Sequence, residues 1–182
     1  MSEPLLGTSP RIKAKIAGVF YLITFLAGGV ALMVHGRLGF VAGLIAGACY
    51  IAVTLLFYYI FRPVSMSLSL FAACVSLLGC AIGPVSVYVH ALSRINPLAF
   101  FGFYCLMIGY LIFRSTFLPR ILAVLMVIAG LGWLTFLSPP LAFLSPYIFV
   151  PGLVGEGALT VWLLAAGVNT QRWKEQTSGA RG

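Results

Sequence analysis

Apolar runs of about twenty residues recur along this chain and are separated by very short connections. Because a helix rises about 1.5 Å per residue, about 20 apolar residues cross the roughly 30 Å hydrocarbon core of a bilayer. The pattern therefore predicts an all-α, polytopic membrane protein, a bundle of six transmembrane helices with short loops. The predicted spans cover about residues 16–34, 38–61, 66–91, 97–113, 118–137 and 148–168.

Composition places the chain in the same class. Hydrophobic residues make up 62% of it and charged residues 8%, and its mean hydropathy of +1.10 lies far outside the range of soluble domains. The connections are too short for a soluble module, and three residues, 35–37, join the first two spans into a hairpin. We expect a basic N-terminal segment (1–15), a six-helix domain (16–168) and a polar tail (169–182) that is frayed.

Basic residues between the spans are strongly asymmetric. Cytoplasmic loops carry an excess of Lys and Arg, so both termini are expected in the cytoplasm, as an even number of spans requires. We expect a multi-pass protein of the cell inner (cytoplasmic) membrane, with the lipid bilayer as its partner. The net charge of +8 is scattered between apolar runs, so no nucleic-acid binding is expected. One side holds only Arg37 and Arg94, and the other holds Arg11, Lys13, Lys15, Arg62, Arg114, Arg120, Arg172, Lys174 and Arg181.

One acidic residue, Glu156, interrupts the last apolar run. The other two acids, Glu3 and Glu175, lie near the ends of the chain. An ionisable group inside the bilayer costs about 2.5–3.5 kcal/mol on insertion scales, so it is usually sheltered, partnered or protonated. Glu156 lies about eight residues into the predicted span from its non-cytoplasmic end, a depth of about 12 Å. The rest of the bundle is therefore expected to shelter or to use this carboxyl group.

Two interpretations of Glu156 are open. In the first, it forms the floor of an outward-opening pocket, with His90, Arg94 and Tyr88 as ligand-binding partners at similar depth. Its neighbours Gly152 and Gly155, next to Pro151, would also bind a ligand through locally freed backbone. In the second, Glu156 is protonated and hydrogen-bonds a backbone carbonyl or a tyrosine, which only locks the bundle. The second interpretation assigns close packing to the glycines.

Small residues form a stripe on the second span. Gly39, Gly43 and Gly47 recur every fourth residue, a spacing that lets another helix approach closely. Internal packing is the favoured interpretation, and the seam of a homodimer is the alternative. The four cysteines lie within apolar runs and are expected to be small packing residues.

The sequence argues against several chemistries. A single intramembrane acid provides no carboxylate pair for hydrolysis, and no zinc-hydrolase or serine-hydrolase motif is present. An enzyme is therefore less favoured, although a Ser86 and His90 pair, four residues apart, lies on one helix face. No cofactor is expected. His35 and His90 lie near the same membrane surface, so haem held by two histidines is a further alternative.

Several strings resemble a family of small bacterial integral membrane proteins catalogued as domain of unknown function 4386. They lie within residues 16–173, and the most specific is the arginine-bounded hairpin of the fourth and fifth spans. The strings are Ile16-Ala17-Gly18, Leu22-Ile23-Thr24-Phe25, Phe61-Arg62-Pro63-Val64-Ser65, Gly102-Phe103-Tyr104-Cys105, Gly109-Tyr110-Leu111-Ile112-Phe113-Arg114-Ser115, Leu118-Pro119-Arg120-Ile121-Leu122, Gly155-Glu156, Trp162-Leu163-Leu164 and Gly167-Val168-Asn169.

The resemblance implies a six-helix bacterial inner-membrane protein with no established activity. It also implies a longer link between the first two spans than the three residues found here. The function expected first is non-enzymatic binding or transport of a small lipophilic or cationic compound through Glu156. A structural or regulatory membrane subunit without ligand is the first alternative, and a membrane-embedded enzyme or haem protein is the second.

Overall fold

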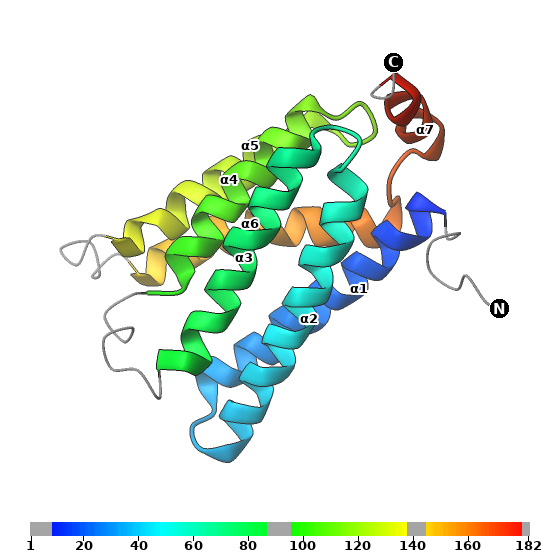
Figure 1. Ribbon diagram of the computed structural model, residues 1–182. Helices are drawn as coiled ribbons and strands as arrows, with labels where there is room; N and C mark the ends of the chain where they lie inside the picture. Colours follow the sequence, from blue (N-terminus) through cyan, green and yellow to red (C-terminus); the bar gives the residue numbers. More distant parts are fainter. Residues whose placement is uncertain (1–8, 87–95, 138–144, 180–182) are drawn as a thin grey trace.

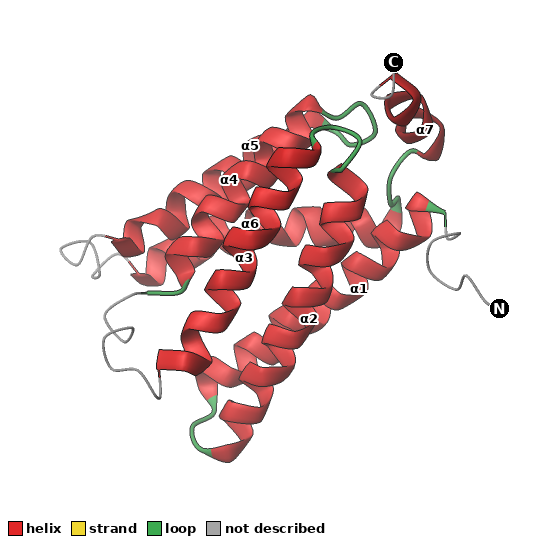
Figure 2. Cartoon of the chain, viewed as in Figure 1, coloured by secondary structure: helices red, strands yellow, loops and turns green. Residues whose placement is uncertain are grey.

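The computed structural model describes residues 9–86, 96–137 and 145–179 (Figure 1). Within these ranges the chain forms seven α-helices and one short 3-10 helix, and it contains no strand (Figure 2). The elements are α1 (Pro10–Met33), α2 (Arg37–Phe61), α3 (Met66–Ser86), α4 (Leu98–Arg114), α5 (Arg120–Leu134), η2 (Thr135–Leu137), α6 (Ser145–Ala165) and α7 (Thr170–Gly179).

Several of these helices are long and apolar enough to cross a membrane. Pro10–Met33, Arg37–Phe61 and Arg120–Leu137 each meet this criterion, and α6 meets it together with α7, from which it is bent by 104°. The apolar helices Met66–Ile82 and Leu98–Arg114 are shorter. The prediction of an all-α membrane protein is thereby confirmed, with three or four helices that meet the length criterion.

The six apolar helices form a closed ring. Each helix from α1 to α6 packs against the next one along the chain, and α6 returns to pack against α1 (Figure 1). Short links explain most of this order, since they hold consecutive helices antiparallel and adjacent. The contact between α6 and α1 is the one that no link enforces. It depends on packing and, as described below, on a buried hydrogen bond.

Glycines let the α4 and α5 backbones approach closely. A Cβ atom added at Gly102 would lie 3.0 Å from the Gly130 carbonyl oxygen, and one added at Gly130 would lie 2.9 Å from that of Gly102. No hydrophobic effect drives helices together inside lipid, so dispersion contacts at such crossings supply much of the attraction. The α4–α5 pair is therefore a tightly packed part of the ring.

The small-residue stripe on α2 packs internally at one end only. A Cβ atom at Gly39 would clash with the Val34 carbonyl, and one at Gly43 would lie 3.8 Å from the Ala31 side chain. No described atom lies within 4 Å of the equivalent position at Gly47. Gly39 and Gly43 thus pack internally against the last residues of α1 and the link that follows it. A homodimer seam near Gly47 stays a prediction.

The expectation of a frayed tail after Asn169 is wrong. Residues 170–179 form α7, which Asn169 caps by accepting a hydrogen bond from the Arg172 backbone N–H at 3.1 Å. The indole N–H of Trp173 donates to the Ile60 carbonyl oxygen at the end of α2, at 2.9 Å. Gly167, at φ 68°, turns the chain between α6 and α7. Capping and this anchor stabilise a helix that its own polar sequence would not.

Both ends of the described chain lie at one end of the bundle. The Arg11 Nε donates to the Ala166 carbonyl oxygen at 3.2 Å, which joins the start of α1 to the end of α6. Gln176 of α7 donates to the Arg114 carbonyl oxygen at 3.3 Å, where α4 ends. Arg37 begins α2 at the opposite end. The described cationic residues at the shared end are Arg11, Lys13, Lys15, Arg62, Arg114, Arg120, Arg172 and Lys174.

Candidate functional site

Glu156 lies on α6 with 5% of its surface exposed, and it faces the interior of the ring. Its two carboxyl oxygens have different partners. The Tyr21 hydroxyl on α1 donates to Oε2 at 2.5 Å, and the Trp133 indole N–H on α5 donates to Oε1 at 2.6 Å. The thiol of Cys105, fully buried on α4, is close enough to interact with the same carboxyl. Four helices thus converge on one acidic side chain.

These groups lie near the middle of the bundle. Tyr21 is eleven residues from the start of α1 and Glu156 is nine residues from the end of α6, and these two helix ends meet at Arg11 and Ala166. At about 1.5 Å per residue, both side chains originate about 14–16 Å from that end. Because α6 begins at Ser145, Glu156 also lies about 16 Å from the other end of its helix, deeper than the predicted 12 Å.

Further polar side chains occupy the same layer on α2, α3 and α4. Thr54 and Ser76, both fully buried, share a hydrogen bond of 2.7 Å between their hydroxyl groups. Tyr50 and Tyr104 are also buried, and neither hydroxyl has a hydrogen-bond partner among the described residues. Together with Tyr21, Trp133 and Glu156, these residues give every helix of the ring a polar group near mid-depth.

The two donors favour one protonation pattern for Glu156. An indole N–H can only donate, so Oε1 acts as an acceptor whether or not the carboxyl group carries a proton. A tyrosine hydroxyl both donates and accepts. A proton on the carboxyl group is therefore best placed on Oε2, where Tyr21 reverses its role and accepts. The pair Tyr21 and Glu156 can gain or lose a proton without losing its hydrogen bond.

No cationic side chain is paired with Glu156 in the described part of the chain. The described lysines and arginines lie near the ends of the helices, six or more residues along the chain from this layer. An uncompensated carboxylate at this depth is costly, so a proton or another cation must balance it. The site is therefore suited to exchange between a proton and a positively charged group.

The predicted rim of the pocket falls in a segment outside the described residues. His90, Arg94 and Tyr88 lie outside the described residues, as does the partnership of Ser86 with His90. Of the two histidines proposed for haem, His35 is exposed in the link between α1 and α2. Among the described residues, no group of three His, Cys, Asp or Glu side chains is close enough to hold a metal ion.

The glycines beside Glu156 pack against α5. A Cβ atom at Gly152 would clash with the Trp133 ring, and one at Gly155 would lie 2.8 Å from the Ala129 Cβ atom. The helix continues through Pro151 without interruption, although this residue cannot donate a backbone hydrogen bond. In this structure Gly152 and Gly155 therefore create the space in which the Trp133 indole reaches the carboxyl group. Close packing is the role that the second interpretation assigns to them, and ligand binding by Gly152 and Gly155 stays a prediction.

The partners Tyr21 and Trp133 were not identified by sequence reasoning, which considered residues near one membrane face. A signal was present. Tyr and Trp concentrate at membrane interfaces, where their polar atoms meet water, so those placed mid-span need an internal partner. Tyr21, Tyr50 and Tyr104 each lie at least six residues from both ends of their helices. Trp133 lies one residue from the end of α5 and gave no such signal.

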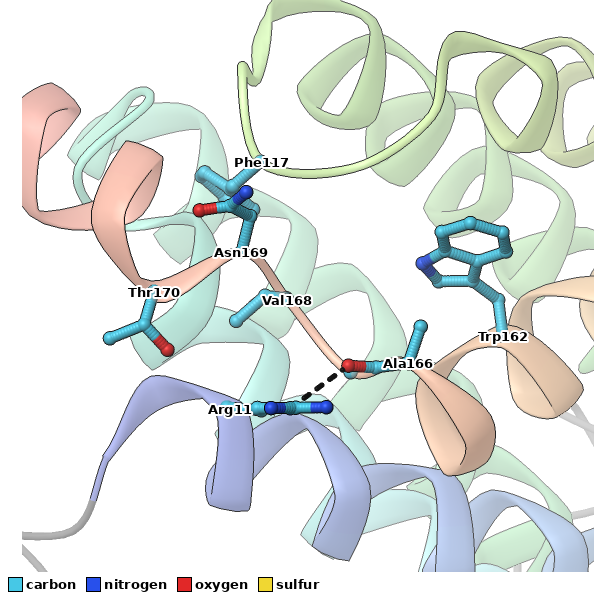
Figure 3. Close-up of a pocket in the computed structure, with 8 residues that line it drawn as sticks. Arg11, Phe117, Trp162, Ala166, Val168, Asn169 and Thr170 are labelled. Carbon is cyan, nitrogen blue, oxygen red and sulfur yellow. Dashed lines mark hydrogen bonds between the residues drawn. The ribbon is translucent and has the colours of Figure 1, made fainter.

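A separate cavity of about 450 Å³ lies at the basic end of the bundle, the end that holds both described termini and most of the described lysines and arginines (Figure 3). Arg11 lies along its edge, and the hydrogen bond from Arg11 Nε to the Ala166 carbonyl oxygen caps the end of α6 (Figure 3). A cation is favourable at the carboxyl end of a helix, so this contact has a sufficient structural explanation. The lining residues are Arg11, Phe117, Trp162, Ala166, Gly167, Val168, Asn169 and Thr170, and they do not include Glu156.

Comparison with known proteins gives the family context of this site. Residues 88–167, which contain Trp133 and Glu156, match the family described as "Domain of unknown function (DUF4386)". The predicted resemblance is confirmed over this segment. The match covers α4, α5 and α6, whereas Tyr21 lies outside the matched residues.

A relative from Archaeoglobus fulgidus is similar to this chain and is described as "Uncharacterized protein". The two are 28% identical over 126 residues, which cover 64% of this chain and 76% of the relative. No solved structure matches the chain.

Proposed function

We propose that this protein binds or transports a small lipophilic or cationic compound, with Glu156 exchanging between that compound and a proton. The observation that carries the proposal is the buried Glu156 carboxyl, held by Tyr21 and Trp133 and paired with no described cationic side chain. Ionisable groups kept at this depth are commonly functional. Non-enzymatic binding is favoured because one acid without a second catalytic group provides little for hydrolysis.

Aromatic side chains around the carboxyl group support a cationic ligand. The Tyr21 ring contacts the rings of Phe25, Tyr50 and Phe57 at centroid distances of 5.3, 5.7 and 6.0 Å. Aromatic faces attract cations and contribute about 2 kcal/mol or more where water is excluded. A lipophilic cation could thus exchange its hydration shell for these rings and the carboxylate.

The structure represents a closed state in this proposal, because the carboxyl group is already hydrogen-bonded on both oxygens. Tyr21 belongs to the α1–α2 hairpin, whereas Trp133 and Glu156 belong to the α5–α6 pair. Separation of α1 from α6 would break one hydrogen bond and leave the other intact. We therefore propose that movement of the hairpin opens the site and that the return of Tyr21 closes it.

The proposed topology is six transmembrane segments, α1 to α6, with both termini in the cytoplasm of an inner membrane. Lysines and arginines at one end of the bundle support this orientation, since cytoplasmic loops are enriched in these residues. The shorter apolar helices α3 and α4 would then cross with their flanking residues. A midplane position for Glu156 follows from this topology and is typical of transporter sites.

The experiment that tests the function is cation binding to the purified protein and to a Glu156→Gln variant. Tetraphenylphosphonium is a suitable first probe because it is lipophilic, permanently charged and not a proton donor. The proposal expects binding to wild type and at least tenfold weaker binding to the variant. Glu175→Gln, an exposed change on α7, is the matched control and should bind as wild type does. Equal binding by all three proteins would contradict the proposal.

A structural or regulatory subunit is the second candidate function. The observation that favours it is that both oxygens of Glu156 already have internal donors, as expected of a carboxyl group that joins helices. This alternative expects Glu156→Gln to keep wild-type stability, because the amide oxygen still accepts from Trp133 and the amide N–H can donate to Tyr21, while no cation binds either protein. Native mass spectrometry of gently extracted protein separates the two functions, because a retained adduct that disappears in the variant requires a ligand site.

A further inference from the structure

Two buried tyrosine hydroxyls near Glu156 are not used by the site described above. Tyr50 on α2 is 6% exposed and Tyr104 on α4 is 1% exposed, and neither hydroxyl oxygen has a hydrogen-bond partner among the described residues. Tyr21 is close enough to interact with the Tyr50 hydroxyl and Thr54 with that of Tyr104, but neither pair meets the geometric criteria of a hydrogen bond. A buried hydroxyl without a partner costs about 1–3 kcal/mol, so its retention calls for an explanation.

The two tyrosine rings belong to the same cluster of aromatic side chains as Tyr21 of the Glu156 site. The Tyr50 ring makes edge contacts with Tyr21 at 5.7 Å, with Tyr104 at 5.9 Å and with Phe101 at 4.7 Å, all between centroids. The Glu156 carboxyl is close enough to act electrostatically on both tyrosines. The hydroxyl groups and the carboxyl group therefore belong to one contiguous cluster of buried side chains, which extends from α6 through α1 to α2 and α4.

We propose that Tyr50 and Tyr104 are specificity-determining donors for the compound that Glu156 binds. The inference rests on the proposed function and adds the second half of the ligand. The ligand class is a lipophilic organic cation that also carries a hydrogen-bond acceptor, an ether, ester or carbonyl oxygen. The cationic group is held by Glu156, and the acceptor receives a hydrogen bond from Tyr50 or Tyr104.

This arrangement explains why phenylalanine does not occupy the two positions. Phenylalanine would fill the same space and remove the unsatisfied hydroxyl group, so the ligand-free protein would not lose stability. A hydroxyl that is unsatisfied in the closed, ligand-free state gains its hydrogen bond only when the ligand enters. Sites of this kind discriminate against analogues that lack the matching polar atom.

The test uses two isosteric probes, hexyltrimethylammonium and (2-propoxyethyl)trimethylammonium, in which an ether oxygen replaces one methylene group. Their affinities are measured for wild type, Tyr50→Phe, Tyr104→Phe and the control Tyr110→Phe, whose side chain is 50% exposed. We expect wild type and the control to favour the ether by about threefold to tenfold, the ratio that one hydrogen bond supplies. At least one of the buried variants should lose this preference while its affinity for the alkyl probe stays unchanged.

The other outcomes contradict the inference, and they differ in whether the proposed function also fails. Two results would show that the Tyr50 and Tyr104 hydroxyls make no hydrogen bond to the ligand. In the first, wild type binds both probes without preferring the ether; in the second, the preference persists in both Phe variants. The proposed function would stand in either case. If wild type binds tetraphenylphosphonium but neither probe, this inference fails and the proposed function stands; if it binds none of the three cations, both fail. Thermal unfolding of the ligand-free variants, expected at or above the wild-type temperature, shows that a lost preference does not reflect misfolding.

Discussion

The Tyr21 hydroxyl donates to the Glu156 carboxyl across 135 residues of chain and thereby joins the first helix of the ring to the last. The rest of the contact between α1 and α6 is mostly apolar, and Gly18 of α1 packs closely against Leu163 and Leu164 of α6. One hydrogen bond therefore has two roles. It satisfies a buried acid, and it holds the ring closed.

Loss of the Tyr21 hydroxyl should destabilise the closed bundle. In Tyr21→Phe the aromatic packing is kept while Oε2 of Glu156 loses its donor, so we expect the free energy of unfolding to fall by about 1–3 kcal/mol. Thermal unfolding in detergent measures this change. Tyr110→Phe, at a half-exposed position on α4, is the control and should unfold as wild type does. An unchanged Tyr21→Phe variant would show that the hydrogen bond contributes nothing to stability.

The glycines around Glu156 should differ sharply in their tolerance to alanine. At Gly155 the added methyl group would lie 2.8 Å from Ala129 and also meet the Leu125 carbonyl, so overpacking should cost about 1–3 kcal/mol. At Gly157 no described atom lies within 4 Å, so alanine should be neutral or stabilise the helix by up to about 1 kcal/mol. Thermal unfolding of both variants provides the comparison. Equal stabilities would argue against the close approach of α5 and α6.

Helix α7 should depend on its cap. Asn169→Ala removes the side-chain oxygen that accepts from the Arg172 N–H, and such caps contribute about 0.5–2 kcal/mol. Hydrogen exchange should therefore become faster within residues 170–179 and stay unchanged in α4 and α5. Thr177→Ala, which removes a bond only to the carbonyl one turn earlier, is the control. Uniform protection in Asn169→Ala would mean that the Trp173 anchor alone maintains this helix.

The proposed orientation can be tested with reporters fused after the C-terminus. Green fluorescent protein folds and fluoresces in the cytoplasm, whereas alkaline phosphatase requires the oxidising periplasm for its disulfides. We expect fluorescence from the first fusion and no phosphatase activity from the second, when each is expressed in a Gram-negative host. The reverse result would place the basic end of the bundle outside and would reject the orientation read from the lysines and arginines.

Most helix limits could be predicted from sequence to within a few residues because they are local, whereas α1 begins at Pro10, six residues before the predicted start. Arg37, Phe61 and Arg114 lie at changes from apolar to charged or turn-forming sequence, and the helices begin or end there. Helix α7 was missed for the opposite reason. Its sequence is polar, and it is held by the cap at Asn169 and by the contact of Trp173 with the end of α2.

The site was predicted in part. Glu156 is conspicuous because no other acid lies within a predicted span. Its burial is expected because an ionisable side chain exposed to lipid is costly. Its partners depend on which helices meet and at what depth, and the contact of α6 with α1 leaves no local signature. Tyr21 and Trp133 become identifiable only once the ring closes, although the mid-span position of Tyr21 marks it as a residue in need of a partner.

The central claim is that Glu156 exchanges a proton for a cation, and the number of protons released on binding tests it most directly. Isothermal titration of tetraphenylphosphonium, repeated in buffers of different ionisation enthalpy, gives this number. Near neutral pH the account predicts release of up to about one proton per cation bound by wild type, rising as the pH is lowered, and no release by Glu156→Gln. Cation binding without proton release at any pH, unchanged in Glu156→Gln, would contradict it.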